Sequence, residues 1–235
     1  MGQIFLVRHG QASFGAADYD RLSERGHLQS RVLGAWFAGL GQGFDRAVTG
    51  TLRRHVETAE SCLAALPEAA GTPMPVEVDP GFDEFAWREM MARSRPDLAR
   101  PQALPALLAG SPDPHRQFQE IFAAAFDRWV GGAHDGEYRE SWPAFRARAI
   151  GAVTRLIETA AAGERIAVFT SGGAIAAICQ ACLAVPDHAV QRLNVSLVNA
   201  SVTGLLFNRT SYSLNYFNNF AHLEQARPGG LVTYR

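Results

Sequence analysis

The chain has 235 residues, of which 47% are hydrophobic and 19% are charged, so it is long enough to bury a sizeable core. Its formal net charge is −1 and its basic residues are scattered, a pattern that argues against binding to nucleic acid or to an anionic membrane. The charge pattern therefore favours a small-molecule partner. Three cysteines, an odd number, argue against a disulfide framework, so we expect a cytoplasmic protein.

The first part of the chain alternates short apolar runs with helical patterns. Residues 3–7 form an expected buried strand, and Ser23 is placed to cap a helix that runs to about Leu40. Residues 47–49 predict a second strand, followed by a helix from Arg53 to Leu66, and Val76 to Val78 predict a third strand. This alternation of strands and helices predicts a largely parallel sheet.

The middle of the chain interrupts this pattern. Five of the twelve prolines lie between Pro96 and Pro114, which predicts loops and short turns, and we expect a lid-like insertion over residues 85–140. Apolar residues at helical spacing over 118–129 predict one helix, and a second stripe over 145–156 follows Pro143. We interpret both stripes as core packing.

The last part of the chain completes the expected sheet. Ile166 to Thr170 predict a fourth strand and Ala174 to Val185 a helix, while residues 201–207 and 212–217 predict a hairpin. The fold that we expect is α/β, a three-layer sandwich whose mostly parallel mixed sheet has helices on both faces, with a helical and loop insertion. We expect one domain over residues 1–235.

Candidate catalytic residues follow the first two strands. His9 comes directly after Arg8 at the end of the first strand, where ligand sites of α/β folds are usually located. A neutral imidazole can attack phosphorus, and a neighbouring guanidinium can hold phosphoryl oxygens in a bidentate fork. Arg54 opens the helix after the second strand, so its side chain is expected to face the same crevice.

Two further strand ends supply the remaining parts of a phosphoryl-transfer site. Glu84 follows the third strand among aromatic residues, surroundings that can raise a carboxyl pKa toward the value that a general acid needs. Ser171 and Gly172 follow the fourth strand and open a helix, a turn that can bind an anion or, for Ser171, serve as an N-cap.

The segment Leu6-Val7-Arg8-His9-Gly10-Gln11-Ala12 resembles the signature of the histidine phosphatase superfamily, in its phosphoglycerate mutase-like branch. The resemblance covers most of the chain and thins out from about residue 90 to 140. It implies a mixed sheet between helices, a phosphohistidine on His9, and no metal or other cofactor. Further segments resemble the family's helix opening, its arginine motif, its general acid and its C-terminal end: Leu22 to Gly26, Leu52 to Ala59, Glu84, and Asn218 with His222-Leu223.

The chain also departs from the family pattern. Ser171 stands where the resemblance implies a second histidine that donates to the phosphoryl group, and Gly15 stands where many members carry a phosphate-binding Asn. Gly50 stands where many carry Ser. Ser171 and the glycine turns can still donate hydrogen bonds to phosphate, and His55 and His222 are alternative donors that the sequence alone does not place.

The resemblance favours a metal-independent phosphatase that hydrolyses a small phosphorylated metabolite. A catalytically weak or inactive relative that binds a phosphorylated ligand is the alternative, and a mutase-type phosphotransferase is a third reading. The sequence leaves the oligomeric state open, a homodimer included. Four residues of the insertion are the expected specificity determinants: Phe85, Trp87, Arg88 and Arg93.

Overall fold

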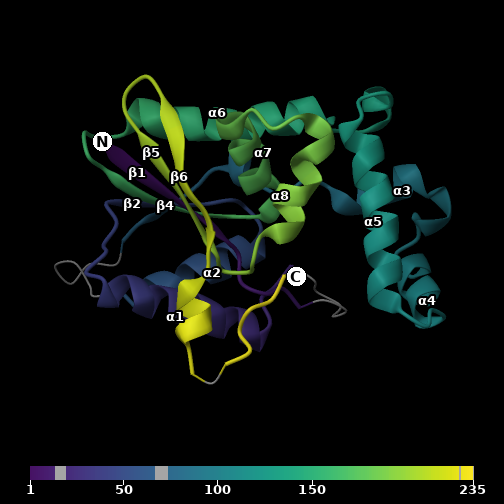
Figure 1. Ribbon diagram of the computed structural model, residues 1–235, viewed down its shortest axis with the longest axis horizontal. Helices are drawn as coiled ribbons and strands as arrows, with labels where there is room; N and C mark the ends of the chain where they lie inside the picture. Colours follow the sequence, from purple (N-terminus) through teal and green to yellow (C-terminus); the bar gives the residue numbers. More distant parts are fainter. Residues whose placement is uncertain (14–19, 67–73, 228, 235) are drawn as a thin grey trace.

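The computed structural model describes residues 1–13, 20–66, 74–227 and 229–234. Its strands form one six-stranded mixed sheet in the order β3-β2-β4-β1-β5-β6 (Figure 1). Strands β1 to β4 pair in parallel, whereas β5 is antiparallel to both β1 and β6. The strands are β1 Gly2–Arg8, β2 Arg46–Thr49, β3 Val76–Val78, β4 Arg165–Thr170, β5 Val202–Phe207 and β6 Tyr212–Asn219.

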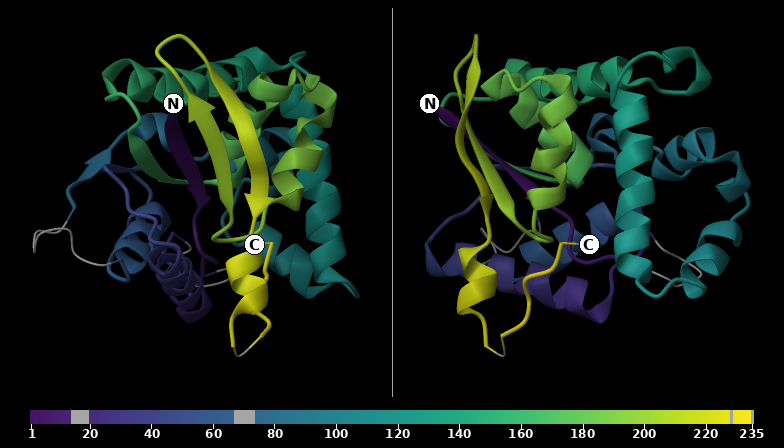
Figure 2. Two further views of the ribbon diagram at one scale, coloured as in Figure 1. Left: turned by 60° about the vertical axis from the view of Figure 1, so that its left-hand side comes forward. Right: turned by 45° about the vertical axis from the view of Figure 1, so that its right-hand side comes forward.

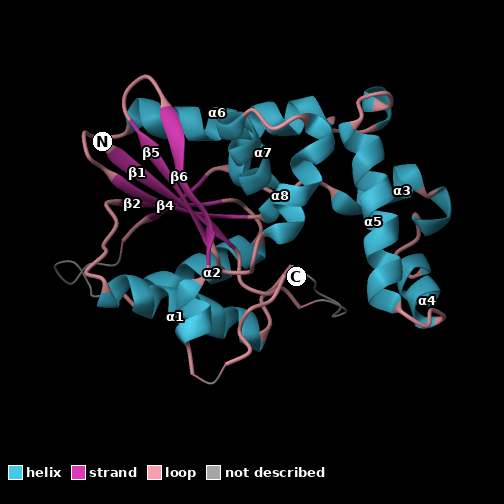
Figure 3. Cartoon of the chain, in the orientation of Figure 1, coloured by secondary structure: helices cyan, strands magenta, loops and turns pink. Residues whose placement is uncertain are grey.

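Helices cover both faces of the sheet, with α1 and α2 on one face and α6 and α7 on the other (Figures 1 and 3). This is the expected three-layer α/β arrangement, which the structure confirms. The helices are α1 Glu24–Gly39, α2 Arg53–Leu63, α3 Trp87–Ser94, α4 Ala103–Ala109, α5 Pro114–Val130, α6 Trp142–Thr159, α7 Gly172–Leu183, α8 Val190–Ser196 and α9 Ala221–Gln225. Short 3-10 turns are η1 Pro80–Phe82, η2 Pro96–Leu98, η3 Asp135–Glu137 and η4 Asp187–Ala189.

The alternation of side chains along β1 explains why both faces are buried. Ile4 and Leu6 belong to the core under α6 and α7, whereas Phe5 and Val7 belong to the core under α1 and α2. A strand that is covered on both sides has to be apolar at successive positions, as residues 4–7 of β1 are. Two separate cores therefore hold β1 in its place in the sheet.

The predicted helices form, with shifts at their ends. Ser23 caps α1, since its hydroxyl accepts from the Gly26 N–H at 3.1 Å, and Pro143 lies in the first turn of α6. Helix α2 ends at Leu63, three residues before the predicted Leu66. The expectation of an irregular segment between Pro96 and Pro114 was wrong in part. Helix α4 forms there because Pro105 is its third residue, where proline removes no intrahelical donor.

The segment expected as an insertion is mainly helical. Helices α3, α4 and α5 lie to one side of the sandwich (Figures 1 and 2), and α5 packs against α3, α4, α6 and α8. Aromatic side chains of α5 join the core of the sandwich, where Phe126 contacts Trp142 with ring centroids 6.1 Å apart. Residues 85–140 therefore contribute both to the core and to the lining of a cavity.

The carboxyl ends of four parallel strands meet at one edge of the sheet, which brings together the segments that follow Arg8, Thr49, Val78 and Thr170. Crevices at this edge are the usual ligand sites of open α/β sheets. Across the described ranges, no helix is both long and apolar enough to span a bilayer.

Candidate active site

His9 lies directly beyond β1 and is fixed on both sides. Its backbone N–H donates to the Thr170 carbonyl at 2.9 Å, and its carbonyl accepts from the Ala200 N–H at 3.2 Å. The ring atom Nδ1 lies 2.7 Å from the Gly10 carbonyl, which can only accept, so Nδ1 carries the proton. The lone pair is therefore on Nε2, and the ring lines a cavity of about 820 Å³.

Arg8 and Arg54 line the same cavity as His9. The Arg8 guanidinium donates to the main-chain carbonyls of Leu197 and Tyr234, and Arg54 is ion-paired with Asp20. Thr58 connects the helix of Arg54 to the turn of His9, because its hydroxyl donates to the Arg54 carbonyl and accepts from the Gly10 N–H. The two guanidinium groups and the imidazole thus face one cavity.

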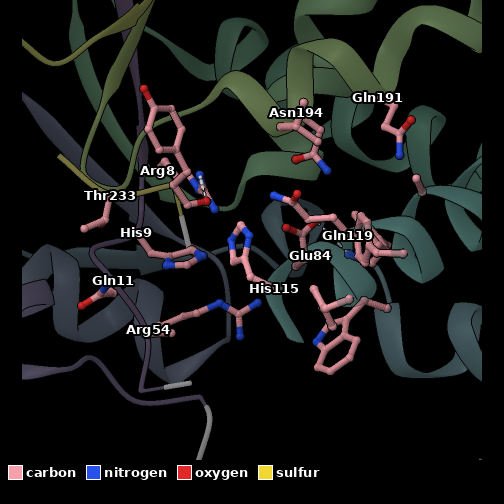
Figure 4. A pocket seen from close by; sticks show the side chains of 18 of the residues that line it. Arg8, His9, Gln11, Arg54, Glu84, His115, Gln119, Gln191, Asn194 and Thr233 are labelled. Atoms are coloured by element: carbon pink, nitrogen blue, oxygen red, sulfur yellow. Dashed lines mark hydrogen bonds between the residues drawn. The ribbon is translucent and has the colours of Figure 1, made fainter. Parts of the chain in front are cut away.

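Glu84 lies on the other side of the cavity, across from Arg8, His9 and Arg54 (Figure 4). Its carboxylate accepts from the N–H groups of Gly173 and Phe85, both at 3.2 Å. Residue 173 has to be glycine for this contact, since a Cβ there would lie 2.1 Å from Glu84 Oε1. The α7 N-terminus and the loop after η1 together hold the carboxyl group over the cavity.

The surroundings set the protonation of these groups. Burial lowers the pKa of His9 well below its ordinary value, and the charges of Arg54 and Arg8 lower it further, so the imidazole is neutral. Burial raises the pKa of Glu84, although Arg54 acts in the opposite direction. A neutral nucleophile therefore faces a carboxyl group whose proton is held more firmly than usual.

Ser171 and His55 form a buried pair beside the cavity. The Ser171 hydroxyl lies 2.6 Å from His55 Nε2, and both side chains are fully buried. The imidazole rings of His55 and His9 have centroids 5.9 Å apart. Burial lowers the pKa of His55 well below its ordinary value, and Arg54 lowers it further. A second neutral histidine thus lies in ring contact with His9.

Other predicted residues have different positions. Gly172 is buried at the start of α7, where a Cβ would lie 2.7 Å from Asn194 Oδ1, and Gly15 lies outside the described residues. His222 packs against Trp36, with ring centroids 5.6 Å apart, and does not line the cavity.

The expected specificity determinants divide into two groups. Phe85 and Trp87 line the cavity, whereas Arg88 stacks on Trp87 and Arg93 is 3.9 Å from Glu89, outside the cavity lining. A further set of lining residues from α5, α8 and the C-terminal segment was not predicted, because no motif marks them: His115, Phe118, Gln119, Phe122, Gln191, Asn194, Thr233 and Tyr234.

Asp20 and Thr58 both contact Arg54, and the sequence did not predict either contact. Asp20 follows no strand and carries no recognisable motif, while Thr58 lies within the Leu52 to Ala59 segment that resembles the family. In the part of the chain that the structure describes, no three His, Cys, Asp or Glu side chains gather as a metal site.

The family model described as the histidine phosphatase superfamily (branch 1) matches residues 4–129 and 111–220. No curated protein matches the chain.

Several solved structures share the fold. Phosphoserine phosphatase from Entamoeba histolytica aligns with a TM-score of 0.65 at 18% identity, over 95% of this chain and 100% of that one. A phosphoglycerate mutase from Bacillus anthracis gives 0.64 at 18% identity, over 94% of each chain. The mycobacterial glucosyl-3-phosphoglycerate phosphatase gives 0.60 at 22% identity, over 93% of this chain and 99% of that one.

Proposed function

The chain belongs to branch 1 of the histidine phosphatase superfamily, and we propose that it is a metal-independent phosphatase of small phosphomonoesters that forms a phosphohistidine on His9. The observation that carries this proposal is the arrangement around one cavity of a neutral His9 between two arginines, with a Glu84 carboxyl group of raised pKa across from them. Two guanidinium groups supply the positive charge that a transferring phosphoryl group requires.

The first step transfers the phosphoryl group to the enzyme. His9 Nε2 attacks phosphorus while Arg8 and Arg54 hold the equatorial oxygens, and the bond between phosphorus and the ester oxygen breaks. The Glu84 carboxyl group gives its proton to the leaving oxygen, which departs as an alcohol. The Gly10 carbonyl, which accepts from Nδ1, favours the charge that the ring gains when Nε2 forms its bond to phosphorus.

The second step releases phosphate. The Glu84 carboxylate takes a proton from water, whose oxygen attacks phosphorus, and the bond between phosphorus and Nε2 breaks. His9 returns to its neutral form and Glu84 to its protonated form, so the cycle closes without a cofactor. Asp20 is ion-paired with Arg54, and its carboxylate has to give way to, or share the guanidinium with, the incoming phosphoryl oxygens.

The cavity is larger than a phosphoryl group requires, and this supports an organic phosphomonoester as the substrate. Its lining combines an aromatic wall with side-chain amides and His115. The related structures include two phosphatases and a mutase, so hydrolysis and transfer to a second substrate are both represented at this fold.

The proposal is tested with the purified protein on a panel of small phosphomonoesters, beside the His9→Ala variant. We expect phosphate release by the native protein, an acid-labile phosphoenzyme, and the loss of both in the variant. Transfer of the phosphoryl group to a second substrate in place of water would indicate the mutase reaction. No turnover, with phosphate still raising the melting temperature, would indicate a binding protein and overturn the phosphatase proposal.

A further inference from the structure

The buried pair of His55 and Ser171 is not used in the steps above. Ser171 occupies the N-cap position of α7, yet its side chain makes no capping hydrogen bond there. Its hydroxyl instead contacts His55 Nε2 at 2.6 Å. The Ser171 side chain therefore does not act as a helix cap.

His55 is also not an ordinary satisfied core histidine. Its Nδ1 has no hydrogen-bond partner among the residues that the structure describes, and the nearest carboxylate oxygen, Asp83 Oδ1, is 4.0 Å away. Burying a polar atom without a partner costs about 1–3 kcal/mol, so an apolar residue would serve stability better at this position. An unpartnered polar atom of this kind calls for an explanation outside packing.

Gly50 makes the room that the imidazole occupies. A Cβ at residue 50 would lie 2.4 Å from His55 Nδ1 and 2.6 Å from Asp83 Oδ1, so no other residue fits without displacing the ring. Gly50 and Ser171 are two of the positions at which the chain departs from the family pattern. The two departures are thus one feature, a pocket built for an imidazole that comes from α2.

The pair does not line the cavity, but it adjoins the elements that carry the reacting groups. Ser171 follows Thr170, whose carbonyl accepts from the His9 N–H at 2.9 Å, and it precedes the turn whose Gly173 N–H binds Glu84. His55 follows Arg54 on α2. The hydrogen bond between His55 and Ser171 therefore joins the elements that carry His9, Arg54 and Glu84.

We propose that His55 is a positioning residue for the phosphatase reaction, and that it holds the Ser171 hydroxyl so that this hydroxyl donates to the transferring phosphoryl group. The pair would supply the hydrogen bond for which the resemblance implies a histidine at position 171. This inference rests on the proposed function, because it assigns the pair a part in that reaction.

The hydrogen-bonding capacity of the two groups is consistent with this assignment. A hydroxyl has one proton, so Ser171 can donate to a phosphoryl oxygen only if it accepts from a proton on His55 Nε2. Asp83 does not need a proton on Nδ1, because its two oxygens accept from the Thr51 N–H and hydroxyl, each at 2.6 Å. With the ring proton on Nε2, only an acceptor is left unpaired at Nδ1.

The test moves the imidazole from one helix to the other. In His55→Ala, we expect kcat to fall roughly a hundredfold, the usual effect of losing one hydrogen-bond donor to a transition state, with a smaller change in KM because both arginines remain. In the double variant His55→Ala with Ser171→His, we expect kcat to recover to within about tenfold of the native value, because a donor again faces the phosphoryl group. His55→Gln keeps an N–H donor toward Ser171 and should retain more activity than His55→Ala.

Stability and binding measurements make the outcomes unambiguous. Melting temperatures identify any variant that fails to fold, and a structural role alone would not restore kcat in the double variant. The inference is overturned if His55→Ala keeps kcat within about threefold, or if the double variant is no better than His55→Ala.

If the native protein releases no phosphate from any ester, the phosphatase proposal fails by itself, and orthovanadate binding then tests the pair. Weaker binding in His55→Ala with recovery in the double variant would support the positioning role, and unchanged binding would overturn it.

Discussion

At the scale of single residues, the site depends on two pKa values that move in opposite directions. Burial and two cationic neighbours lower the pKa of His9, and burial raises the pKa of Glu84. Two groups whose pKa values are moved apart in this way are typical of a site in which one group is the nucleophile or base and the other is the acid. Burial produces this separation, and the Gly173 N–H acts against it, because a hydrogen bond donated to the Glu84 carboxylate lowers the pKa of that group.

Glu84→Gln tests the acid directly. A glutamine cannot give up a proton, so kcat/KM for alkyl phosphates should fall by about 10²–10⁴-fold. The fall in kcat/KM should be much smaller for p-nitrophenyl phosphate, whose leaving group departs without a proton. Initial rates at substrate concentrations far below KM exclude the second step, in which Glu84 acts as a base on either substrate, and an equal loss of kcat/KM on the two would rule out the acid role of Glu84.

The pH profile gives a second test of Glu84. A general acid must be protonated in the free enzyme, so kcat/KM of the native protein should decline as the pH rises through the raised pKa of Glu84. The Glu84→Gln variant should lack this decline and keep a flat profile on the basic side. Asp83→Asn is the matched comparison, because Asp83 is the neighbouring carboxylate but does not line the His9 cavity.

At the scale of elements, the expectations for strands and most helices were correct because periodicity carries them. The apolar runs that became β1 and β4 needed no partner information, and Ser23 marks the start of α1 by its own chemistry. Helix α4 was missed because proline was counted against helix formation without regard to its place in the first turn.

The candidate site likewise combines residues that the sequence predicts with residues that it does not. Residues that directly follow strands could be placed from the sequence, because parallel strands end at one edge of the sheet. Side chains such as His115 and Gln119 could not, since α5 reaches the cavity only through its packing against other helices. His55 was an open alternative because the direction of its side chain depends on the room beside Gly50 and on Ser171, which is distant in the sequence.

The loop that carries Glu84 is held by one side chain of α6. The Arg148 Nη1 donates to the carbonyls of Pro80, Gly81 and Asp83 at 2.9 to 3.2 Å, while the rest of the guanidinium pairs with Glu140. In Arg148→Met, we expect a lower melting temperature and a several-fold lower kcat, because Glu84 loses its fixed position.

Inhibition by orthophosphate distinguishes a displaced Glu84 from weaker phosphate binding in Arg148→Met. The inhibition constant should change little in Arg148→Met, because Arg8 and Arg54 are untouched. Arg155→Met is the matched control, since Arg155 lies on the same helix and pairs with Asp79 just before the loop, but at the surface. A normal kcat in Arg148→Met would show that the loop keeps its position without this contact.

At the scale of the whole molecule, the sheet separates two cores, and buried histidines lie in or beside them. His9, His55 and His222 are each less than a tenth exposed. Burial lowers the pKa of each one below its ordinary value. Because the unfolded chain binds protons at these histidines before the folded protein does, the folded state must lose stability as the pH falls below about 6.5.

His222 is the residue at which this effect can be measured apart from catalysis, because it packs against Trp36 outside the cavity. Burial lowers the pKa of His222 to about 4. The contribution of His222 to the free energy of unfolding is therefore constant above about pH 6.5 and falls as the pH decreases toward 4. His222→Leu should therefore remove about 2 kcal/mol of the destabilisation at pH 5 while changing little at pH 8. Urea unfolding at both pH values measures it, with exposed His188→Gln as the control. An equal change in the free energy of unfolding of His222→Leu at both pH values would mean that packing, and not protonation, sets the contribution of His222.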